Sequence, residues 1–245
     1  MNGIVFYDGP SRLNGYDILG IATGLVTPSH NRKTGAMAQT WILNKHHDPV
    51  EANALSLDRA NCGSCLLRGL GTNGKRTCYV NLGQAPLSIW RAYQAGRYPF
   101  VPLDDLSTHG QHRYIRLGAY GDPAAIPIQY WDALLSKAKG WTGYTHQWAN
   151  PRYREVLKYC MASCETEADA VAAHALGAGT FRILPDDLPA LGSEVACPFG
   201  TVPNLTCQTC LRCDGSEGMH VTVTPHGAGA KALVALVRAS SSESS

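Results

Sequence analysis

The amino-acid sequence predicts an α/β protein built on a full or incomplete TIM-type barrel of βα units, with an open doubly wound sheet as the second choice. Beyond residue 111, short β-type runs alternate with helical stretches at a spacing of roughly 20 to 30 residues, which is typical of βα units. The chain has 245 residues, 44% of them hydrophobic, so it can bury one full core. We therefore expect a single domain over residues 1–239, in which the less regular residues 1–110 are an N-terminal elaboration and 111–239 hold the βα units. The polar tail 240–245 is expected to be disordered.

The strands are predicted from apolar and β-branched runs. In the N-terminal part, 38–45 is typical of a strand, 86–99 has helical spacing between two prolines, and 62–78 is a glycine-rich loop. Beyond it, the expected strands are 112–120, 141–148, 160–164, 180–185 and 219–224, with 194–198 leading into a cysteine-rich loop.

The helices between these strands are predicted from periodicity and from end signals. Ile128, Trp131 and Leu134 recur at helical spacing within 125–140. Pro151 suits the first turn of a helix over 151–159. The expected later helices are an alanine-rich segment with a glycine-rich end, 166–179, and a closing helix, 229–239.

The spacing of the C-terminal cysteines indicates metal ligation. Cys207, Cys210 and Cys213 form a C-x2-C-x2-C run, and Cys197 stands ten residues before it. Three thiolates at this spacing can bind different irons of one [4Fe-4S] cluster, while a more distant cysteine completes the ligand set. Structural zinc more often uses two CxxC pairs. We therefore expect an iron–sulfur cluster here, with structural zinc as the alternative.

A first cysteine group lies earlier in the chain. Cys62, Cys65 and Cys78 supply three thiolates with the spacing C-x2-C-x12-C. A second [4Fe-4S] cluster would need either a fourth protein ligand or one open iron that can bind a substrate. Cys164 is the first candidate for that ligand and Cys160 the second, although an inert buried thiol is an equally ordinary role for either.

The setting of these thiols favours metal over disulfides. The N-terminal residues lack the charged and apolar regions of a signal peptide, and a chain of this length does not need disulfides to fold. We therefore expect a cytoplasmic protein with reduced cysteines. The net charge of +2 comes from scattered residues, so we expect no nucleic-acid partner, and no apolar run is long enough for a bilayer, so we expect no membrane association.

Polar residues gather where three of the predicted strands end. Asp122 is a candidate ligand or base, His146 a candidate ligand or acid/base, and Tyr144 a candidate cofactor-binding residue. The carboxyl ends of barrel strands form active sites, so these side chains are expected to share a pocket. The alternatives are that Asp122 caps a helix beginning near Pro123 and that His146 is a hydrogen-bonded core residue.

The motifs CGSC, LGAYGDPAAIP, GYTHQW, CMAS, TFR and TCQTCLRC together resemble a family of bacteriophage and prophage proteins that is recognised by its cysteine clusters and has no assigned reaction. The resemblance covers roughly residues 35–215. It implies that both cysteine groups are ligands, that Asp122 and His146 are motif positions of unassigned role, and that the protein acts in the cytoplasm of a host cell.

The sequence therefore predicts a phage-encoded iron–sulfur protein with one or two [4Fe-4S] clusters. Its role would be redox or cluster-dependent catalysis, with a small-molecule substrate or a redox partner. The alternative is a structural zinc protein that acts as an interaction module.

Overall fold

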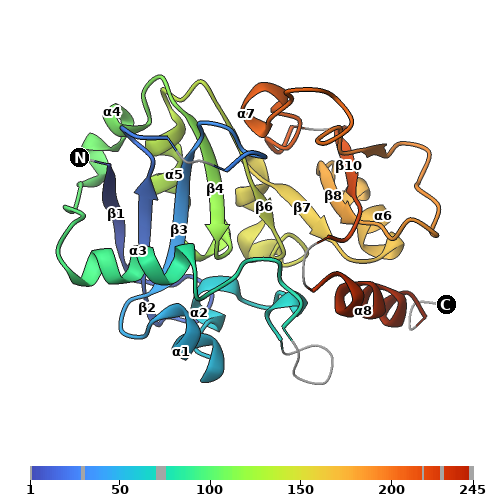
Figure 1. The fold of residues 1–245 in the computed structure, drawn as a ribbon, viewed down its shortest axis with the longest axis horizontal. Coiled ribbons are helices and arrows are strands. Elements are labelled where there is room, and N and C mark those ends of the chain that lie inside the picture. The colour runs from blue at the N-terminus through green and yellow to red at the C-terminus, as the bar shows by residue number, and fades with distance from the viewer. Residues whose placement is uncertain (1, 29–30, 70–75, 217, 227–228, 243–245) are drawn as a thin grey trace.

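The computed structural model describes residues 2–28, 31–69, 76–216, 218–226 and 229–242, with backbone alone for 239–242. The chain forms a mixed α/β fold with two five-stranded sheets that lie side by side (Figure 1). The first sheet has the order β1(Gly3–Pro10), β2(Asp17–Thr23), β3(Ala38–Asn44), β4(Tyr114–Tyr120), β5(Gly140–Thr142). The second has the order β6(Tyr144–Thr145), β7(Met161–Cys164), β8(Thr180–Ile183), β10(His220–Val223), β9(Val195–Ala196).

The two sheets differ in strand direction. The second sheet is parallel throughout, whereas in the first sheet β1, β2 and β3 run antiparallel and only β3, β4 and β5 run parallel. Both sheets are open, and no closed barrel forms among the described strands. The α/β class is confirmed.

Twelve helices connect or cover these strands within the described residues, and four of them are 3-10 helices. In chain order they are α1(Pro49–Ala54), α2(Arg59–Cys62), η1(Leu66–Arg68), α3(Ala85–Gln94), η2(Leu103–Asp105), α4(Leu106–Gly110), η3(Pro123–Ala125), α5(Ile128–Leu135), η4(Pro151–Lys158), α6(Glu167–Ala175), α7(Cys207–Cys210) and α8(Ala230–Ser242).

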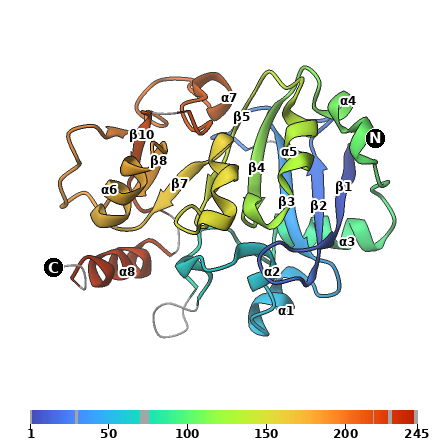
Figure 2. The same cartoon turned by 180° about the vertical axis from the view of Figure 1, so that it is seen from behind.

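The core of the first half lies on both faces of the first sheet. One face packs against α4, α5 and η4 around the fully buried Trp131 and Phe6. The other face packs under α3, where Leu19 and Trp41 are buried (Figures 1 and 2). Because both faces are covered, β3 is buried at every position and shows no alternation of polar and apolar residues.

A break at Gly143 divides the predicted strand 141–148 between the two sheets. The Gly143 amide donates to the Cys213 carbonyl (3.0 Å), and its carbonyl accepts from the Met161 amide (2.9 Å). A Cβ at this position would lie 2.7 Å from the Cys160 sulfur, so only glycine fits. The chain therefore passes from one sheet to the other beside the C-terminal cysteine loop.

Most predicted elements are confirmed, and besides the divided strand 141–148 three differ. The N-terminal part is not an irregular elaboration, because β1 and β2 form one edge of the first sheet and β3 lies at its centre. The segment 151–158 is a 3-10 helix. Helix α8 continues to Ser242, into the tail predicted to be disordered, and residues 243–245 lie outside the described part. In the part of the chain that the structure describes, no helix is long and apolar enough to span a bilayer.

Gly121 follows β4 directly and adopts a backbone conformation that favours glycine. Gly121→Ala should therefore lower the free energy of unfolding by about 3 kcal/mol. Its φ is +88°, and an added Cβ would lie 2.5 Å from the Ile42 Cβ and 2.8 Å from the Ile42 carbonyl oxygen. Chemical denaturation measures the loss. Gly177→Ala is the control, because Gly177 has a φ of +73° but open space around it, so it should lose only about 1 kcal/mol. Equal losses would show that the packing against Ile42 costs nothing.

Candidate metal-binding groups and the cavity between them

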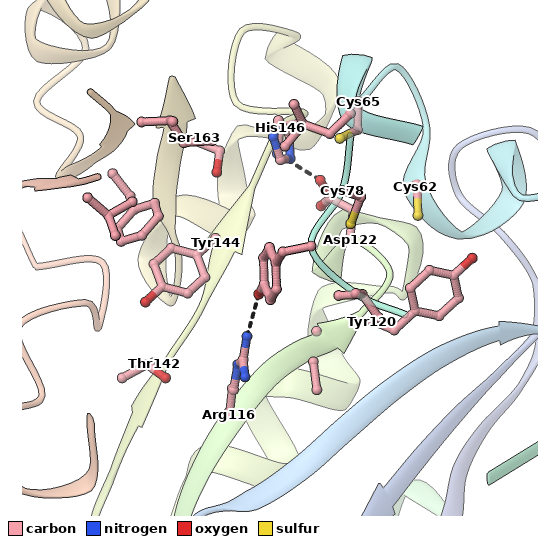
Figure 3. Close-up of a pocket in the computed structure, with 18 of the residues that line it drawn as sticks. Cys62, Cys65, Cys78, Arg116, Tyr120, Asp122, Thr142, Tyr144, His146 and Ser163 are labelled. Atoms are coloured by element: carbon pink, nitrogen blue, oxygen red, sulfur yellow. Dashed lines mark hydrogen bonds between the residues drawn. The ribbon is translucent and has the colours of Figure 1, made fainter. Parts of the chain in front are cut away.

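A cavity of about 320 Å³ opens where the parallel strands end. Its walls come from the carboxyl ends of β4, β6, β7, β8 and β10. Cys62, Cys65 and Cys78 line it at a distance from Arg116 (Figure 3), and Cys207 also lines it. In open α/β sheets ligands bind in the crevice at this edge, so the cavity is the candidate functional site.

The first cysteine group is held together by the backbone. Cys62 ends α2, and the Cys65 amide donates to the Cys62 carbonyl (3.2 Å). The Cys78 amide donates to the Leu67 carbonyl (2.9 Å), so the chain returns beside the loop that carries the first two cysteines. The three thiols are therefore brought together although 12 residues separate Cys65 from Cys78.

A buried ion pair between Asp58 and Arg68 holds the loop that carries Cys62 and Cys65. Asp58 and Arg68 are paired with side chains that are only 2% and 3% exposed. The Asn53 amide donates to the Asp58 carboxylate (2.7 Å) and to the Arg68 carbonyl (3.0 Å). Because an unpaired charge at this depth would be strongly unfavourable, the pair holds the two ends of the Cys62–Cys65 segment in one arrangement.

The thiols of this group are close enough to influence one another. Burial raises the pKa of the Cys62 thiol well above its ordinary value, and nearby Cys65 and Cys78 raise it further. Burial also raises the pKa of Cys78, which Arg76 partly offsets. Three soft sulfur donors in an enclosed site form a donor set that suits zinc or iron–sulfur clusters.

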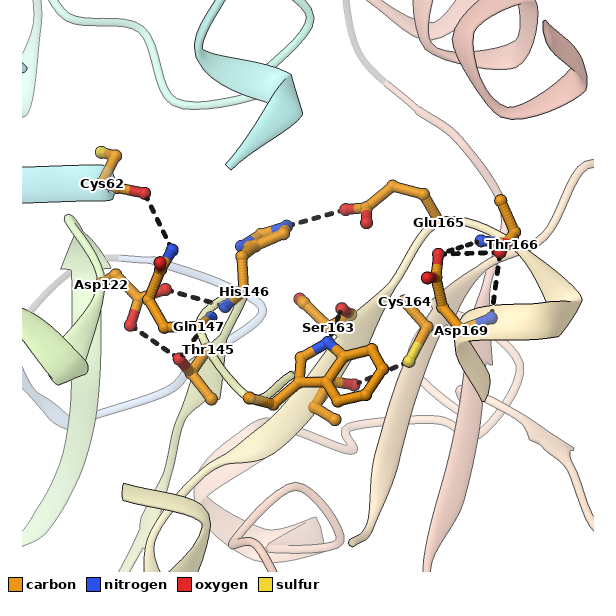
Figure 4. A network of polar contacts seen from close by, with 12 residues as sticks. Cys62, Asp122, Thr145, His146, Gln147, Ser163, Cys164, Glu165, Thr166 and Asp169 are labelled. Atoms are coloured by element: carbon orange, nitrogen blue, oxygen red, sulfur yellow. Dashed lines mark hydrogen bonds and ion pairs between the residues drawn. The ribbon is translucent and has the colours of Figure 1, made fainter. Parts of the chain in front are cut away.

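His146 stands beside the same group (Figure 3), and Figure 4 shows its ring paired with Glu165. Its Nε2 pairs with the Glu165 carboxylate (2.8 Å), and its ring is also hydrogen-bonded to the Cys65 thiol. Burial lowers the pKa of His146, but Cys65 and Glu165 outweigh it, so the pKa lies well above the ordinary value. A carboxylate on one ring nitrogen is the usual support of a histidine that ligates metal through the other. His146 is therefore the residue placed to act as a fourth ligand.

Asp122 positions His146 and caps η3. Its buried carboxylate accepts from the Ala124 amide (3.0 Å), the Thr145 hydroxyl (2.8 Å) and the His146 amide (2.7 Å). Burial raises the pKa of Asp122, although these donors and His146 oppose the effect. Asp122 was considered either as a helix cap or as a ligand or base. The structure shows the helix cap, and a role as ligand or base stays a prediction.

Several buried polar atoms near the first group have no hydrogen-bond partner in the described part of the protein. They include the side-chain amide of Asn61, the hydroxyl of Thr77, the phenol of Tyr120, and guanidinium nitrogens of Arg68 and Arg76. Asn61 and Thr77 directly precede Cys62 and Cys78, and Tyr120 is close enough to Cys62 for that thiol to raise its pKa. Because buried polar groups are nearly always paired, these orphaned atoms fit a site that takes a group which itself accepts hydrogen bonds.

The second cysteine group forms around α7, which begins with a capping box between Thr206 and Thr209. The Cys207 amide donates to the Lys33 carbonyl (2.8 Å), and the Ala36 amide donates to the Gln208 side chain (2.8 Å). The loop 31–36, far away in sequence, thus holds the C-x2-C-x2-C run in place.

Tyr144 links this second group to the cavity. Its hydroxyl is hydrogen-bonded to the Cys213 thiol, and its ring packs on Phe181 with centroids 4.4 Å apart. Burial raises the pKa of Cys213 to about 12, and Cys207, Cys197 and Cys210 each raise it as well. The four predicted ligands are therefore neighbours in the structure, and Tyr144 contacts one of them.

Cys164, predicted as a fourth ligand of the first group, lies elsewhere. It is buried in a separate hydrophobic cluster with Trp148 and Ala170, does not line the cavity, and donates to the Ala162 carbonyl. Because side chains alternate along β7, Ser163 faces the cavity while Cys164 faces α6. Cys160 is buried in the main core against Gly143. The structure thus brings His146, not Cys164 or Cys160, to the first group.

Neither cysteine group is a finished metal site. Among the described residues, no set of three or more His, Cys, Asp or Glu side chains is arranged to hold a metal ion as it stands. Metal binding therefore requires the side chains of a group to rotate toward a common centre. The cysteines are free, and those of the two groups are partly exposed as residues, although the thiols of Cys62, Cys78 and Cys213 are buried.

Sequence reasoning missed Arg116, which lines the cavity from the middle of β4. The available signal was a single arginine in the strand sequence YIRLGAY, whose other residues are apolar, small or aromatic. No protein-family profile matches the chain, and no curated protein and no solved structure is significantly similar to it.

Proposed function

We propose that this chain is an iron–sulfur protein that holds one [4Fe-4S] cluster at Cys197, Cys207, Cys210 and Cys213 and a second centre at Cys62, Cys65 and Cys78. The observation that carries the proposal is that one cavity is lined by all three cysteines of the first group and by Cys207 of the second. A cavity in contact with two thiol-rich groups suits chemistry in which a bound molecule exchanges electrons with a cluster. Such clusters supply one-electron transfer or an iron that binds substrate.

The chain's own residues would support this chemistry in distinct ways. Glu165 orients the His146 imidazole, and Asp122 fixes the backbone on which His146 stands. Tyr144 donates a hydrogen bond to Cys213. Hydrogen bonds to the sulfurs are a main determinant of cluster potential, so Tyr144 is placed to tune the C-terminal centre.

The scaffold and origin of the protein belong to the same proposal. Two runs of parallel neighbours support a barrel-like scaffold, because β4 and β5 in the first sheet and β6, β7 and β8 in the second are adjacent in the order in which they occur in the sequence. We infer such a barrel-like scaffold, in a phage-encoded protein that works in the host cytoplasm on a small molecule or with a redox partner.

A structural zinc protein is the second candidate, and one observation favours it. Three cysteines with His146 form a Cys3His set, which is a standard tetrahedral zinc site. In that case the metal would fix the glycine-rich loops, and the protein would act as an interaction module. The C-terminal C-x2-C-x2-C run argues for iron–sulfur in at least one group.

Metal and sulfide analysis, with a visible spectrum, on protein purified without oxygen distinguishes these candidates. Two clusters predict about eight iron and eight sulfide per chain with a broad absorption near ~400 nm. About four of each, with one zinc, would assign iron–sulfur to the C-terminal group and zinc to the first. Zinc alone in a colourless protein would contradict the iron–sulfur proposal and support the interaction module.

A further inference from the structure

Arg116 stands in the wall of the cavity without an acidic partner. Among the residues that the structure describes, its side chain makes one hydrogen bond, from Nη2 to the Tyr79 hydroxyl (2.6 Å), and no ion pair. Arg116 lines the cavity (Figure 3), and because a guanidinium carries five N–H donors and stays charged in proteins, its other donors have no hydrogen-bond partner among the described residues.

A second cation lies at the same end of the cavity. Lys33 also lines it and is held there because its carbonyl accepts from the Cys207 amide. The Lys33 Nζ lies over the Phe199 ring, 5.6 Å from its centroid, and makes no ion pair among the described side chains. One end of the cavity is therefore cationic.

The walls between the two ends are largely apolar. Phe181, Ile183 and Val223 come from β8 and β10, and Leu233 comes from α8. At the far end stand Cys65 and His146. A molecule that fits this lining has an anionic head, an apolar body and a distal end that reaches the first cysteine group.

We propose that the cavity binds a small organic anion, a carboxylate or phosphate monoester of limited polarity, with its oxyanion on Arg116 and Lys33 and its body along the apolar wall. The guanidinium fork matches the oxygens of either group in a bidentate contact. The proposal deepens the proposed function by naming its substrate class and rests on it for any chemistry at the distal end, but not for binding. A competing explanation for the presence of Arg116 in the cavity is that it serves Cys207, because its positive charge lowers the pKa of that thiol and so favours the thiolate.

Isothermal titration of anaerobically purified protein with phenyl phosphate, benzoate and the neutral benzamide tests the proposal. At least one anion should bind at least about tenfold more tightly than benzamide. Arg116→Gln should weaken that anion about 10- to 100-fold, as expected for charged hydrogen bonds, and Arg116→Lys should weaken it less. Tyr79→Phe should leave binding intact because it removes only the protein partner of Arg116.

The control is Arg97→Gln, which removes the same charge from an exposed position outside the cavity. Equal anion affinity in Arg116→Gln and Arg97→Gln would overturn the proposal. The proposal would also be overturned if the wild-type protein bound no anion and Arg116→Gln lost iron. Arg116 would then act only by stabilising the cysteine thiolates. Iron, sulfide and zinc are measured on every sample, so anion binding to a protein without iron would leave this inference standing and contradict the iron–sulfur function.

Discussion

If the chain holds the two proposed clusters, Cys65→Ala is expected to remove about half of the bound iron and sulfide while the C-terminal cluster stays. Cys65 lies at the centre of the first group, because it neighbours Cys62 and Cys78 and is hydrogen-bonded to His146. Its loss would leave two thiols, which cannot hold a cubane. The measurement is iron and sulfide content together with the visible absorption of anaerobically purified protein.

Cys164→Ala is the matched control, because it removes a thiol of the same kind from outside the cavity. The mutant should keep the full iron content, since Cys164 packs in the cluster with Trp148 and Ala170. Retained iron in Cys65→Ala, or a loss of iron in Cys164→Ala that equals that of Cys65→Ala, would contradict this assignment of ligands. The second result would restore Cys164 to the role that the sequence had indicated.

Asp122→Ala is expected to lower the free energy of unfolding by about 3 to 5 kcal/mol. The substitution leaves three buried donors without an acceptor, namely the amides of Ala124 and His146 and the hydroxyl of Thr145. It also releases the backbone that places His146 beside Cys65. Chemical denaturation of the metal-free protein gives the loss of stability without a contribution from the metal.

Asp48→Ala provides the comparison for that effect. Asp48 is also an N-cap, accepting from the Val50 and Glu51 amides, but its hydrogen bonds are exposed to solvent. Its loss should cost about 1 kcal/mol. Asp122→Asn keeps an acceptor oxygen and should fall between the two. If Asp122→Ala were no more destabilising than Asp48→Ala, the three hydrogen bonds to the Asp122 carboxylate would not be what holds His146 in place. The alternative role of Asp122 as a base would then gain support.

The arrangement around the cavity explains why two distant parts of the sequence are needed for one site. The loop 31–36 holds α7, and α8 packs Leu233 and Leu236 against Leu67 beside Cys65 and Cys78. Each cysteine group is therefore braced by a segment from the opposite end of the chain. Loss of either brace would expose the thiols that face the cavity.

Local patterns were sufficient for most of the elements between residues 112 and 239. The Ile128, Trp131 and Leu134 spacing gave α5, and the residues of β4, β7, β8 and β10 were correctly predicted as strands. The strands β1 and β2 were not predicted, because both are covered or paired within a mixed sheet and neither shows a clean alternation. The break at Gly143 was also missed, because it depends on the approach of Cys160 and Cys213.

The chain by itself determined which residues can act: the spacing of its cysteines, the α/β class, and the polar ends of the strands at Asp122, Tyr144 and His146. These follow from chemistry that is local in sequence, namely ligand spacing and the period of a strand or helix. Only the tertiary structure decided that His146 stands beside Cys65 while Cys164 faces away, and that Arg116 lies in the same cavity. The face of a strand that meets a distant loop depends on register and sheet packing, and these are set by contacts between residues far apart in the chain.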